Sequence, residues 1–284
     1  AIESASAQTP IASPASFVAH PESIVDVDWL AANQDTAEVL LVALMPEPEF
    51  EEAHIGASFR TDWPDLEVVD TSDAGIATWE AAIREHIGDL HIVPENTVVV
   101  YDNGTLFAAR LWWVLRYLGH TDVRVLDGGL PAWRGAGNET VNGPVVMTLE
   151  KRPPYPGTSN PSMLAQRDKV LASLGDPDTV LVDARSPEEY AEGHIPGAIN
   201  INYPQNADGD PPMWKPADEL RELYDAAGVT PYKLVIPYCS SGVRSAVTAC
   251  TLWLIGYPRV ALYTGSWNEW RDLPDAPITE GNQP

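Results

Sequence analysis

The chain has 284 residues, of which 44% are hydrophobic, and its 41 acidic against 17 basic side chains give a formal net charge of −24. Such acidity excludes nucleic acid and anionic membrane surfaces as partners, because both carry negative charge themselves. No apolar run approaches the roughly 20 residues that a membrane span needs, so no membrane partner is expected. The length favours two domains of ordinary size over one.

Residues 1–16 are rich in Ala, Ser, Thr and Pro and carry one charge, which predicts a flexible N-terminal segment. A charged n-region and an apolar h-region, the marks of a signal peptide, are not visible. Small-residue tails of this kind often follow a removed signal. A simple disordered terminus has the same composition, so the compartment stays open, with a periplasmic or secreted location favoured over a cytoplasmic one.

The first predicted domain, residues 17–137, alternates short apolar strands with helices. Strands are expected at 39–43, 97–101 and 123–126, and a helix at 108–118 that Gly119 ends. Residues 138–161 contain many Gly, Pro, Asn and Ser residues and are predicted to be a linker.

The second predicted domain, residues 162–284, repeats this order. Strands are expected at 180–182, 234–236 and 260–262, and a helix at 243–255 that Gly256 ends. Continuous β-branched runs alternating with helices indicate an α/β fold: a mostly parallel sheet with helices on both faces. In such sheets the reactive site lies at the carboxyl ends of the strands.

The two halves are related by an internal repeat. Residues 181–195 align with 41–55, and residues 263–271 with 126–134, as expected for a tandem duplication. The first half has Asp102 where the second has Cys239, and an Ala-Leu-Met run where the second has Asp-Ala-Arg. We interpret the first half as an inactive scaffold that closes one side of the cleft.

Cys239 is the candidate nucleophile. It follows an apolar strand and precedes a tight loop, Gly242, Arg244 and a predicted helix. Backbone N–H groups of the loop and the helix N-terminus can converge on its sulfur, and Arg244 adds a positive charge, so a reactive thiolate is expected. Cys250 lies mid-helix among apolar residues and is interpreted as a core residue. At about 1.5 Å of rise per residue, the two cysteines are too far apart for a disulfide.

Four segments together resemble a known family. They are DARSPEEY at 183–190, GHIPGA at 193–198, CSSGVRS at 239–245 and GSWNEW at 265–270. With the tandem repeat, they resemble two-domain rhodaneses (thiosulfate sulfurtransferases), especially bacterial ones. The resemblance implies two rhodanese-like domains, the second catalytic, and a persulfide carried on Cys239. It implies transfer of a sulfane sulfur from thiosulfate to a thiophilic acceptor such as cyanide or a thiol.

The expected partners are thus a small-molecule sulfur donor and a small-molecule acceptor. We expect the protein to be a monomer and to need no cofactor. The six histidines show no metal-ligand spacing, so no metal is expected. Residues predicted to bind the substrate are Ser240, Ser241, Gly242, Val243, Arg244 and Arg185. Arg244 either grips an anionic donor or pairs with a carboxylate such as Asp183. His194 is assigned to architecture, because its counterpart His54 persists in the first half.

Alternative functions differ in donor and chemistry. The Cys-X-Ser-Gly-Val loop is close to that of mercaptopyruvate sulfurtransferases, so 3-mercaptopyruvate is an alternative donor. Many relatives carry a second arginine after the Asp-X-Arg, where this chain has Glu188 and Glu189, which favours thiosulfate. A persulfide carrier would use the same Cys239. A cysteine-based phosphatase is a further alternative, but its loop between cysteine and arginine is longer than residues 240–243.

Overall fold

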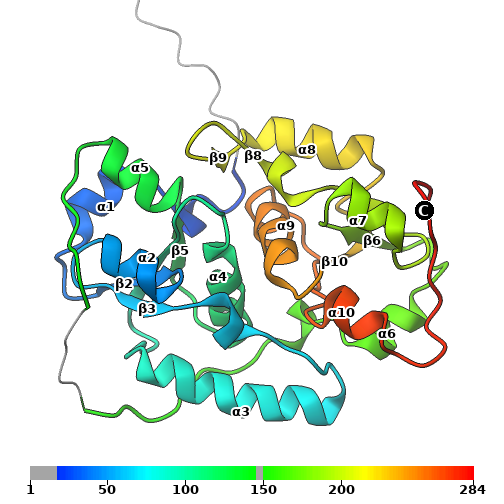
Figure 1. The fold of residues 1–284 in the computed structure, drawn as a ribbon, viewed down its shortest axis with the longest axis horizontal. Coiled ribbons are helices and arrows are strands. Elements are labelled where there is room, and N and C mark those ends of the chain that lie inside the picture. Colours follow the sequence, from blue (N-terminus) through cyan, green and yellow to red (C-terminus); the bar gives the residue numbers. More distant parts are fainter. Residues whose placement is uncertain (1–17, 145–149) are drawn as a thin grey trace, which may run out of the picture.

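The computed structural model describes residues 18–144 and 150–284, in two α/β halves placed side by side (Figure 1). The N-terminal segment at 1–16, predicted to be flexible, lies outside the described residues, as do residues 145–149 of the predicted linker. Within the described residues, no helix combines the length and apolar character needed to cross a membrane.

The first half contains a five-stranded parallel sheet in the order β1-β5-β4-β2-β3. Its strands are β1 (Ile24–Val25), β2 (Val39–Leu44), β3 (Phe59–Thr61), β4 (Thr97–Tyr101) and β5 (Val123–Leu126). Its helices are α1 (Val27–Asn33), α2 (Glu47–Glu52), α3 (Asp73–Asp89), α4 (Ala108–Tyr117) and α5 (Gly129–Gly135). The strands predicted at 39–43, 97–101 and 123–126 and the helix at 108–118 are confirmed.

Both faces of this sheet are covered, as its continuous apolar strands require. In β4, Val98 and Val100 face one buried cluster, and Val99 and Tyr101 face another. Successive side chains of a strand point to opposite faces, so an uninterrupted apolar run can only be buried when both faces are packed.

The second half has the strands β6 (Thr179–Asp183), β7 (Ile199–Asn200) and β10 (Leu234–Tyr238), paired in parallel in the order β10-β6-β7. A separate two-stranded piece comprises β8 (Ala207–Asp208) and β9 (Met213–Trp214). The helices are α6 (Arg167–Ala172), α7 (Pro187–Glu192), α8 (Ala217–Ala226), α9 (Val243–Leu254) and α10 (Ser266–Trp270).

The strand predicted at 260–262 is replaced by isolated bridges, and Pro237 supplies the reason. Val260 bridges Val235 and Leu262 bridges Leu164, both in parallel. Pro237 has no N–H group to donate to this segment, so the ladder is interrupted one step beyond Val235. Hydrogen bonding resumes where the N–H of Tyr263 donates to the Pro237 carbonyl at 3.0 Å.

The two halves share one core across their seam. Helices α4 and α9 lie side by side at the centre of the molecule (Figure 1), and Trp112, Ala246 and Cys250 belong to the same buried cluster. Thr71 adds a polar link, because its N–H and O–H donate to the Glu269 carboxylate at 2.7 and 2.6 Å. The shared core fixes the position of the first half relative to the Cys239 loop.

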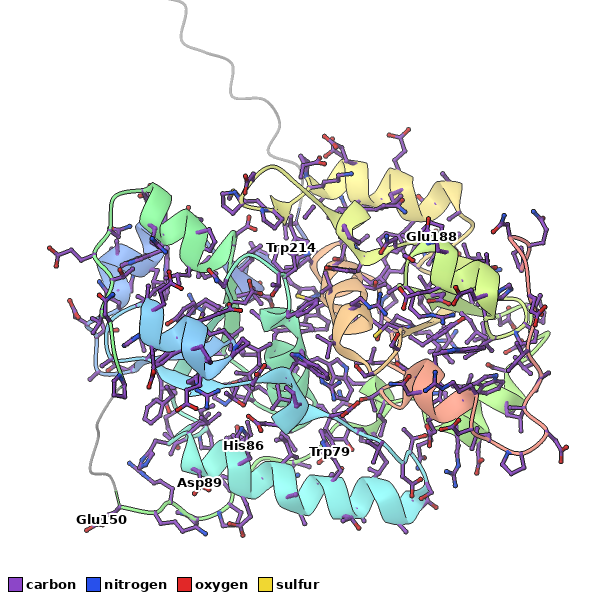
Figure 2. All side chains as sticks on the ribbon, viewed as in Figure 1. Trp79, His86, Asp89, Glu150, Glu188 and Trp214 are labelled. Atoms are coloured by element: carbon purple, nitrogen blue, oxygen red, sulfur yellow. The ribbon has the colours of Figure 1, made fainter. Side chains whose placement is uncertain are left out.

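Trp214 forms a second bridge at the seam (Figure 2). Its indole N–H donates to the Thr251 hydroxyl at 2.9 Å, and its backbone N–H donates to the Asp127 carboxylate of the first half at 3.1 Å. Burial raises the pKa of Asp127 to about 6, and the hydrogen bonds from Trp214 and Gly128 oppose this only in part. An ionised Asp127 therefore weakens the fold.

This pKa predicts how the stability of the protein depends on pH. Because the folded-state pKa lies above the usual 3.8, the contribution of Asp127 is fully present below pH 4 and is lost as the pH rises through about 6. The difference corresponds to up to about 3 kcal/mol. Asp127→Asn, which stays neutral, should melt close to the wild-type temperature at pH 4 and higher at pH 7. A melting-temperature difference that stays constant from pH 4 to 7 would contradict this assignment.

Candidate active site

Cys239 follows β10 directly and opens the loop that leads into α9. Its side chain is buried, with 1% of its surface exposed. The Gly242 N–H donates to the Cys239 Sγ at 3.1 Å, and the Ser245 hydroxyl donates to the same sulfur at 3.5 Å. Two fixed donors thus converge on one sulfur in a site from which water is excluded, an arrangement that stabilises negative charge on it.

Glycine is required at position 242. Its φ of 87° lies in the left-handed region, which side chains other than glycine rarely adopt. A Cβ atom there would also lie 2.7 Å from the Thr264 carbonyl oxygen. Gly242 therefore lets the loop turn tightly enough for its N–H to reach the sulfur.

Helix α10 holds the other side of the loop. The Ser266 hydroxyl accepts the Cys239 N–H at 3.2 Å, and the N–H groups of Trp267 and Asn268 donate to the carbonyls of Cys239 and Ser240 at 2.9 and 3.0 Å. The sequence analysis used the 265–270 segment only for the family resemblance and assigned these residues no role. Their signal in the sequence is the GSWNEW motif itself.

Arg244 pairs with a carboxylate, and that carboxylate is Glu189 of α7. Two hydrogen bonds of 2.7 and 2.8 Å join them, and Arg244 also donates to the Ser240 hydroxyl at 2.6 Å. These bonds raise the pKa of Arg244 and lower the pKa of Glu189 to about 2. The suggested partner Asp183 is therefore incorrect, and Arg244 interacts electrostatically with Cys239 as well as with Glu189.

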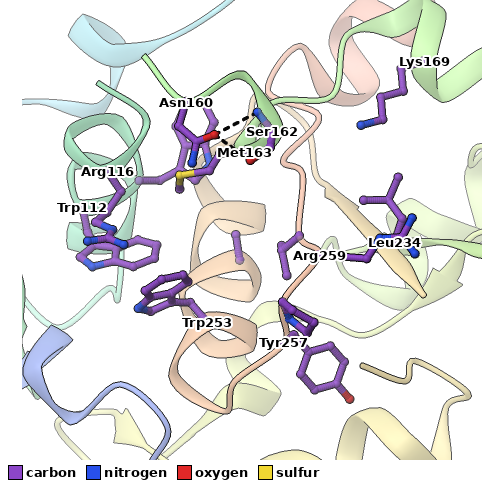
Figure 3. A pocket seen from close by; sticks show the side chains of 14 residues that line it. Trp112, Arg116, Asn160, Ser162, Met163, Lys169, Leu234, Trp253, Tyr257 and Arg259 are labelled. Carbon is purple, nitrogen blue, oxygen red and sulfur yellow. Dashed lines mark hydrogen bonds between the residues drawn. The ribbon is translucent and has the colours of Figure 1, made fainter. Parts of the chain in front are cut away.

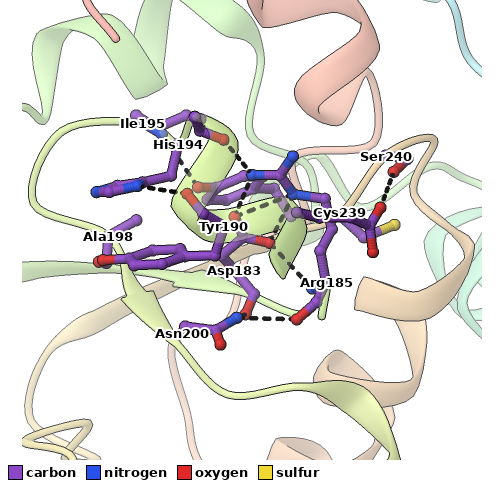
Figure 4. A network of polar contacts seen from close by, with 12 residues as sticks. Asp183, Arg185, Tyr190, His194, Ile195, Ala198, Asn200, Cys239 and Ser240 are labelled. Carbon is purple, nitrogen blue, oxygen red and sulfur yellow. Dashed lines mark hydrogen bonds and ion pairs between the residues drawn. The ribbon is translucent and has the colours of Figure 1, made fainter. Parts of the chain in front are cut away.

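Asp183 pairs instead with Arg185, and both are buried (Figure 4). The Arg185 Nη2 lies 2.6 Å from the Asp183 carboxylate and donates to the Gly193 carbonyl at 2.7 Å. The guanidinium also stacks over Trp267 at 4.6 Å. With Glu189 and Ser240, Arg185 lines a shallow pocket beside the loop, so its predicted role in substrate binding stays a prediction.

Of the remaining residues singled out in the sequence, Ser241 and Val243 belong to the loop and to α9, and His194 lies elsewhere. Ser241 is half-buried at the tip of the loop, and Val243 is buried as the first residue of α9. His194 stacks on Tyr190 at 3.7 Å, and its ring nitrogens contact the carbonyls of Tyr190 and Gln283 (Figure 4). These contacts agree with an architectural role. The described residues contain no cluster of three or more His, Cys, Asp or Glu side chains suited to a metal ion.

Comparison with known proteins identifies the family. Residues 26–136 and 166–273 each match the Rhodanese-like domain. The chain belongs to the rhodanese family. Both copies and the parallel α/β halves confirm the two-domain rhodanese fold expected from the sequence.

Individual relatives of this rhodanese have names that refer to different sulfur donors or to sulfur carriage. A thiosulfate sulfurtransferase of Pseudomonas aeruginosa is 34% identical over 276 residues, covering 90% of this chain and 96% of that protein. A sulfur carrier protein of Thermus thermophilus is 32% identical, covering 93% and 99%. The crystal structure of a 3-mercaptopyruvate sulfurtransferase from Escherichia coli superposes with a TM-score of 0.73 at 27% identity, covering 87% and 99%. Sulfur transfer is common to the family, and the donor varies.

The first rhodanese-like domain keeps the anion-holding loop but fills it with a carboxylate. Asp102 accepts hydrogen bonds from the N–H groups of Gly104, Thr105 and Ala108 at 2.8, 2.9 and 2.7 Å. Thr105 and Ala108 occupy the repeat positions of Gly242 and Ser245, the two residues that donate to the Cys239 sulfur. Burial nevertheless raises the pKa of Asp102. The duplicated loop thus still converges on an acidic group.

Arg110 of the first domain is a residue that the sequence analysis missed. It is fully buried in α4, and its Nη2 donates to the Leu66 carbonyl. Its Nε and Nη1 have no hydrogen-bond partner among the described residues. Burial lowers the pKa of Arg110 to about 10, and electrostatic interactions with Cys239 and Glu67 oppose that effect. Only the three-dimensional packing of α4 against α9 brings this arginine near the loop.

The two cysteines should differ completely in chemistry. Burial in α9 raises the pKa of Cys250, whereas Cys239 has donors on its sulfur. Cys239→Ser should abolish sulfur transfer, and Cys250→Ala should retain most of it. Mass spectrometry after treatment with a sulfur donor should find one added sulfur atom on the peptide that contains Cys239. An active Cys239→Ser protein would overturn the assignment of the nucleophile.

Proposed function

We propose that this protein transfers the outer sulfur of thiosulfate to a thiophilic acceptor such as cyanide or a thiol through a persulfide on Cys239. The thiolate attacks the outer sulfur, a Cys–S–S⁻ anion forms, and the S–S bond of thiosulfate breaks to release sulfite. Cyanide then attacks the outer sulfur of the persulfide, which gives thiocyanate and restores the thiolate. The charges balance in both steps, and no metal or cofactor takes part.

The convergence of two donors on a buried sulfur carries this proposal. The negative charge moves from Sγ to the added sulfur and back, so it remains within the loop throughout the cycle. The Gly242 N–H at 3.1 Å and the Ser245 hydroxyl at 3.5 Å are fixed by β10, α9 and α10 and need no reorganisation during the reaction.

Burial of the sulfur supports thiosulfate as the donor. With 1% of Cys239 exposed, a compact donor with an exposed terminal sulfur reaches Sγ most readily. Arg185 and Arg244 are each engaged with a carboxylate. These pairs limit the cations available to either donor, so the preference for thiosulfate rests on its compact size.

A second candidate donor, 3-mercaptopyruvate, is favoured by the hydroxyl groups near the sulfur. Its thiol proton must move to carbon as pyruvate leaves, and hydroxyls can relay such a proton. Ser245 donates to Sγ, and Ser241 lies in the same loop.

Steady-state kinetics with thiosulfate and 3-mercaptopyruvate, each assayed with cyanide and with a thiol acceptor, test the proposal. We expect a higher kcat/KM for thiosulfate. A much higher value for 3-mercaptopyruvate would reassign the donor and leave the Cys239 persulfide intact. Rapid loading of the persulfide without turnover on either small acceptor would instead favour a carrier that passes sulfur to a protein.

The ion pair between Arg244 and Glu189 predicts a double-mutant effect on donor binding. Arg244→Ala leaves the Glu189 carboxylate uncompensated beside the loop, so the KM for thiosulfate should rise about tenfold, equivalent to about 1.4 kcal/mol. The double mutant Arg244→Ala/Glu189→Gln removes that carboxylate and should recover much of the loss. A double mutant as poor as Arg244→Ala would show that Arg244 contacts the donor directly.

A further inference from the structure

A pocket of about 370 Å³ lies in the seam between the two halves, away from Cys239 (Figure 3). Leu234 at the start of β10 lines it, whereas Cys239 follows the opposite end of that strand. Trp112 and Trp253, from α4 and α9, form an aromatic wall, and Tyr257 lies below them. No step of the proposed sulfur transfer uses this pocket.

The charges of the pocket are the reverse of those of the whole chain. Arg116, Lys169 and Arg259 line it, and no acidic residue does, although the chain carries a net charge of −24. None of the three forms an ion pair within residues 18–144 and 150–284. Glu22 and Asp176, which interact electrostatically with Arg116 and Arg259, lie outside the lining.

Arg116 contributes to both the aromatic wall and the positive charge of the pocket. Its guanidinium stacks over Trp253 at 4.5 Å, and its buried Nε has no hydrogen-bond partner among the described residues. Burial lowers the pKa of Arg116, which means that the charge is only partly solvated. An anion in the pocket would supply the missing partner.

We propose that this pocket binds an amphipathic anion, namely an aromatic ring that carries a carboxylate or sulfonate. The ring would lie against the tryptophans and the anionic group would face the three cations. The proposal is independent of the sulfur-transfer function.

Titration with 1-anilinonaphthalene-8-sulfonate, followed by quenching of tryptophan fluorescence, tests this. Lys169→Glu and Lys151→Glu change the net charge equally, but only Lys169 lines the pocket, and both residues are exposed. We expect Lys169→Glu to weaken binding about tenfold and Lys151→Glu to change it less than twofold. The neutral analogue N-phenyl-1-naphthylamine should bind more weakly than the sulfonate. Equal effects of the two variants, or equal binding of both probes, would overturn the proposal.

A different observation carries a second inference, which concerns Arg110. A fully buried guanidinium with two unpartnered nitrogens is costly unless an anion lies nearby. Its only hydrogen bond within the described residues is to the neutral carbonyl of Leu66. Glu67 interacts electrostatically with Arg110. Among the described residues, it forms no hydrogen bond to Arg110.

The packing places Arg110 on the side of the loop that the first half covers. Helix α4 packs against α9, whose N-cap is Gly242, and the 66–71 segment beside Arg110 reaches α10 through Thr71 and Glu269. Arg244 of the loop also interacts electrostatically with Cys239, but it and other charged groups around the loop are held in ion pairs. These are Arg244 with Glu189, Arg185 with Asp183, and Arg167 with Glu269 and Asp70.

We infer that Arg110 is a positioning residue that stabilises the negative charge of the Cys239 thiolate and persulfide from the first domain. This inference rests on the proposed function only where it concerns the persulfide. The thiolate can be tested without any sulfur donor, so failure of one idea is distinguishable from failure of the other.

The rate of Cys239 alkylation by iodoacetamide, measured against pH in a Cys250→Ala background, reports the thiolate directly. Arg110→Gln should move the midpoint of this profile upward by at least one pH unit, so that alkylation at pH values below the midpoint falls about tenfold. Arg110→Lys keeps the charge and should restore most of the rate. Arg116→Met removes a charge from the far end of α4 and should leave the midpoint unchanged.

Glu67→Gln provides a test that does not disturb the buried arginine. Removing this carboxylate leaves the charge of Arg110 less compensated, so the midpoint should move downward. A folded Arg110→Gln protein with the wild-type alkylation profile would overturn the inference. If Arg110→Gln does not fold, an unchanged midpoint in Glu67→Gln would overturn it instead.

Discussion

The proposed chemistry depends on one constraint, which is that an anionic sulfur must be held in a place from which water is almost absent. Cys239 is 1% exposed, so the donors that water would supply have to come from the protein. A backbone N–H from Gly242 and a hydroxyl from Ser245 provide them. Each is positioned by an element that the sequence builds for packing reasons, namely the β10 strand and the α9 helix.

The local part of this arrangement was predictable from the sequence. An apolar strand, a glycine-containing loop and a helix are contiguous in the chain, so β10, Cys239 and α9 follow from short-range patterns. The repeat identified Asp102 as the counterpart of Cys239 in the same way. What failed locally was the strand at 260–262, where the apolar pattern was correct but Pro237 on the neighbouring strand lacked the required N–H.

The electrostatic part was not predictable, because it depends on pairs that are distant in sequence. Arg244 and Glu189 are 55 residues apart, and the sequence offered several carboxylates as partners with no means to choose among them. The capping box of α7 places Glu189 in the first turn of that helix, facing the loop. Arg110 lies farther still, in the other domain, and an arginine in an apolar helix carries no signal of what it approaches.

The first domain, which we propose to be inactive, then has a clearer physical role than that of a lost copy. Its loop still holds an acidic group with backbone donors, and Asp102 occupies the position that the sulfur occupies in the second domain. A carboxyl group in such a loop satisfies its backbone donors, so the first domain keeps the fold of the loop without a cysteine. That domain contributes α4 to the shared core. The helix that seals the seam also carries the buried Arg110, whose guanidinium interacts electrostatically with Cys239.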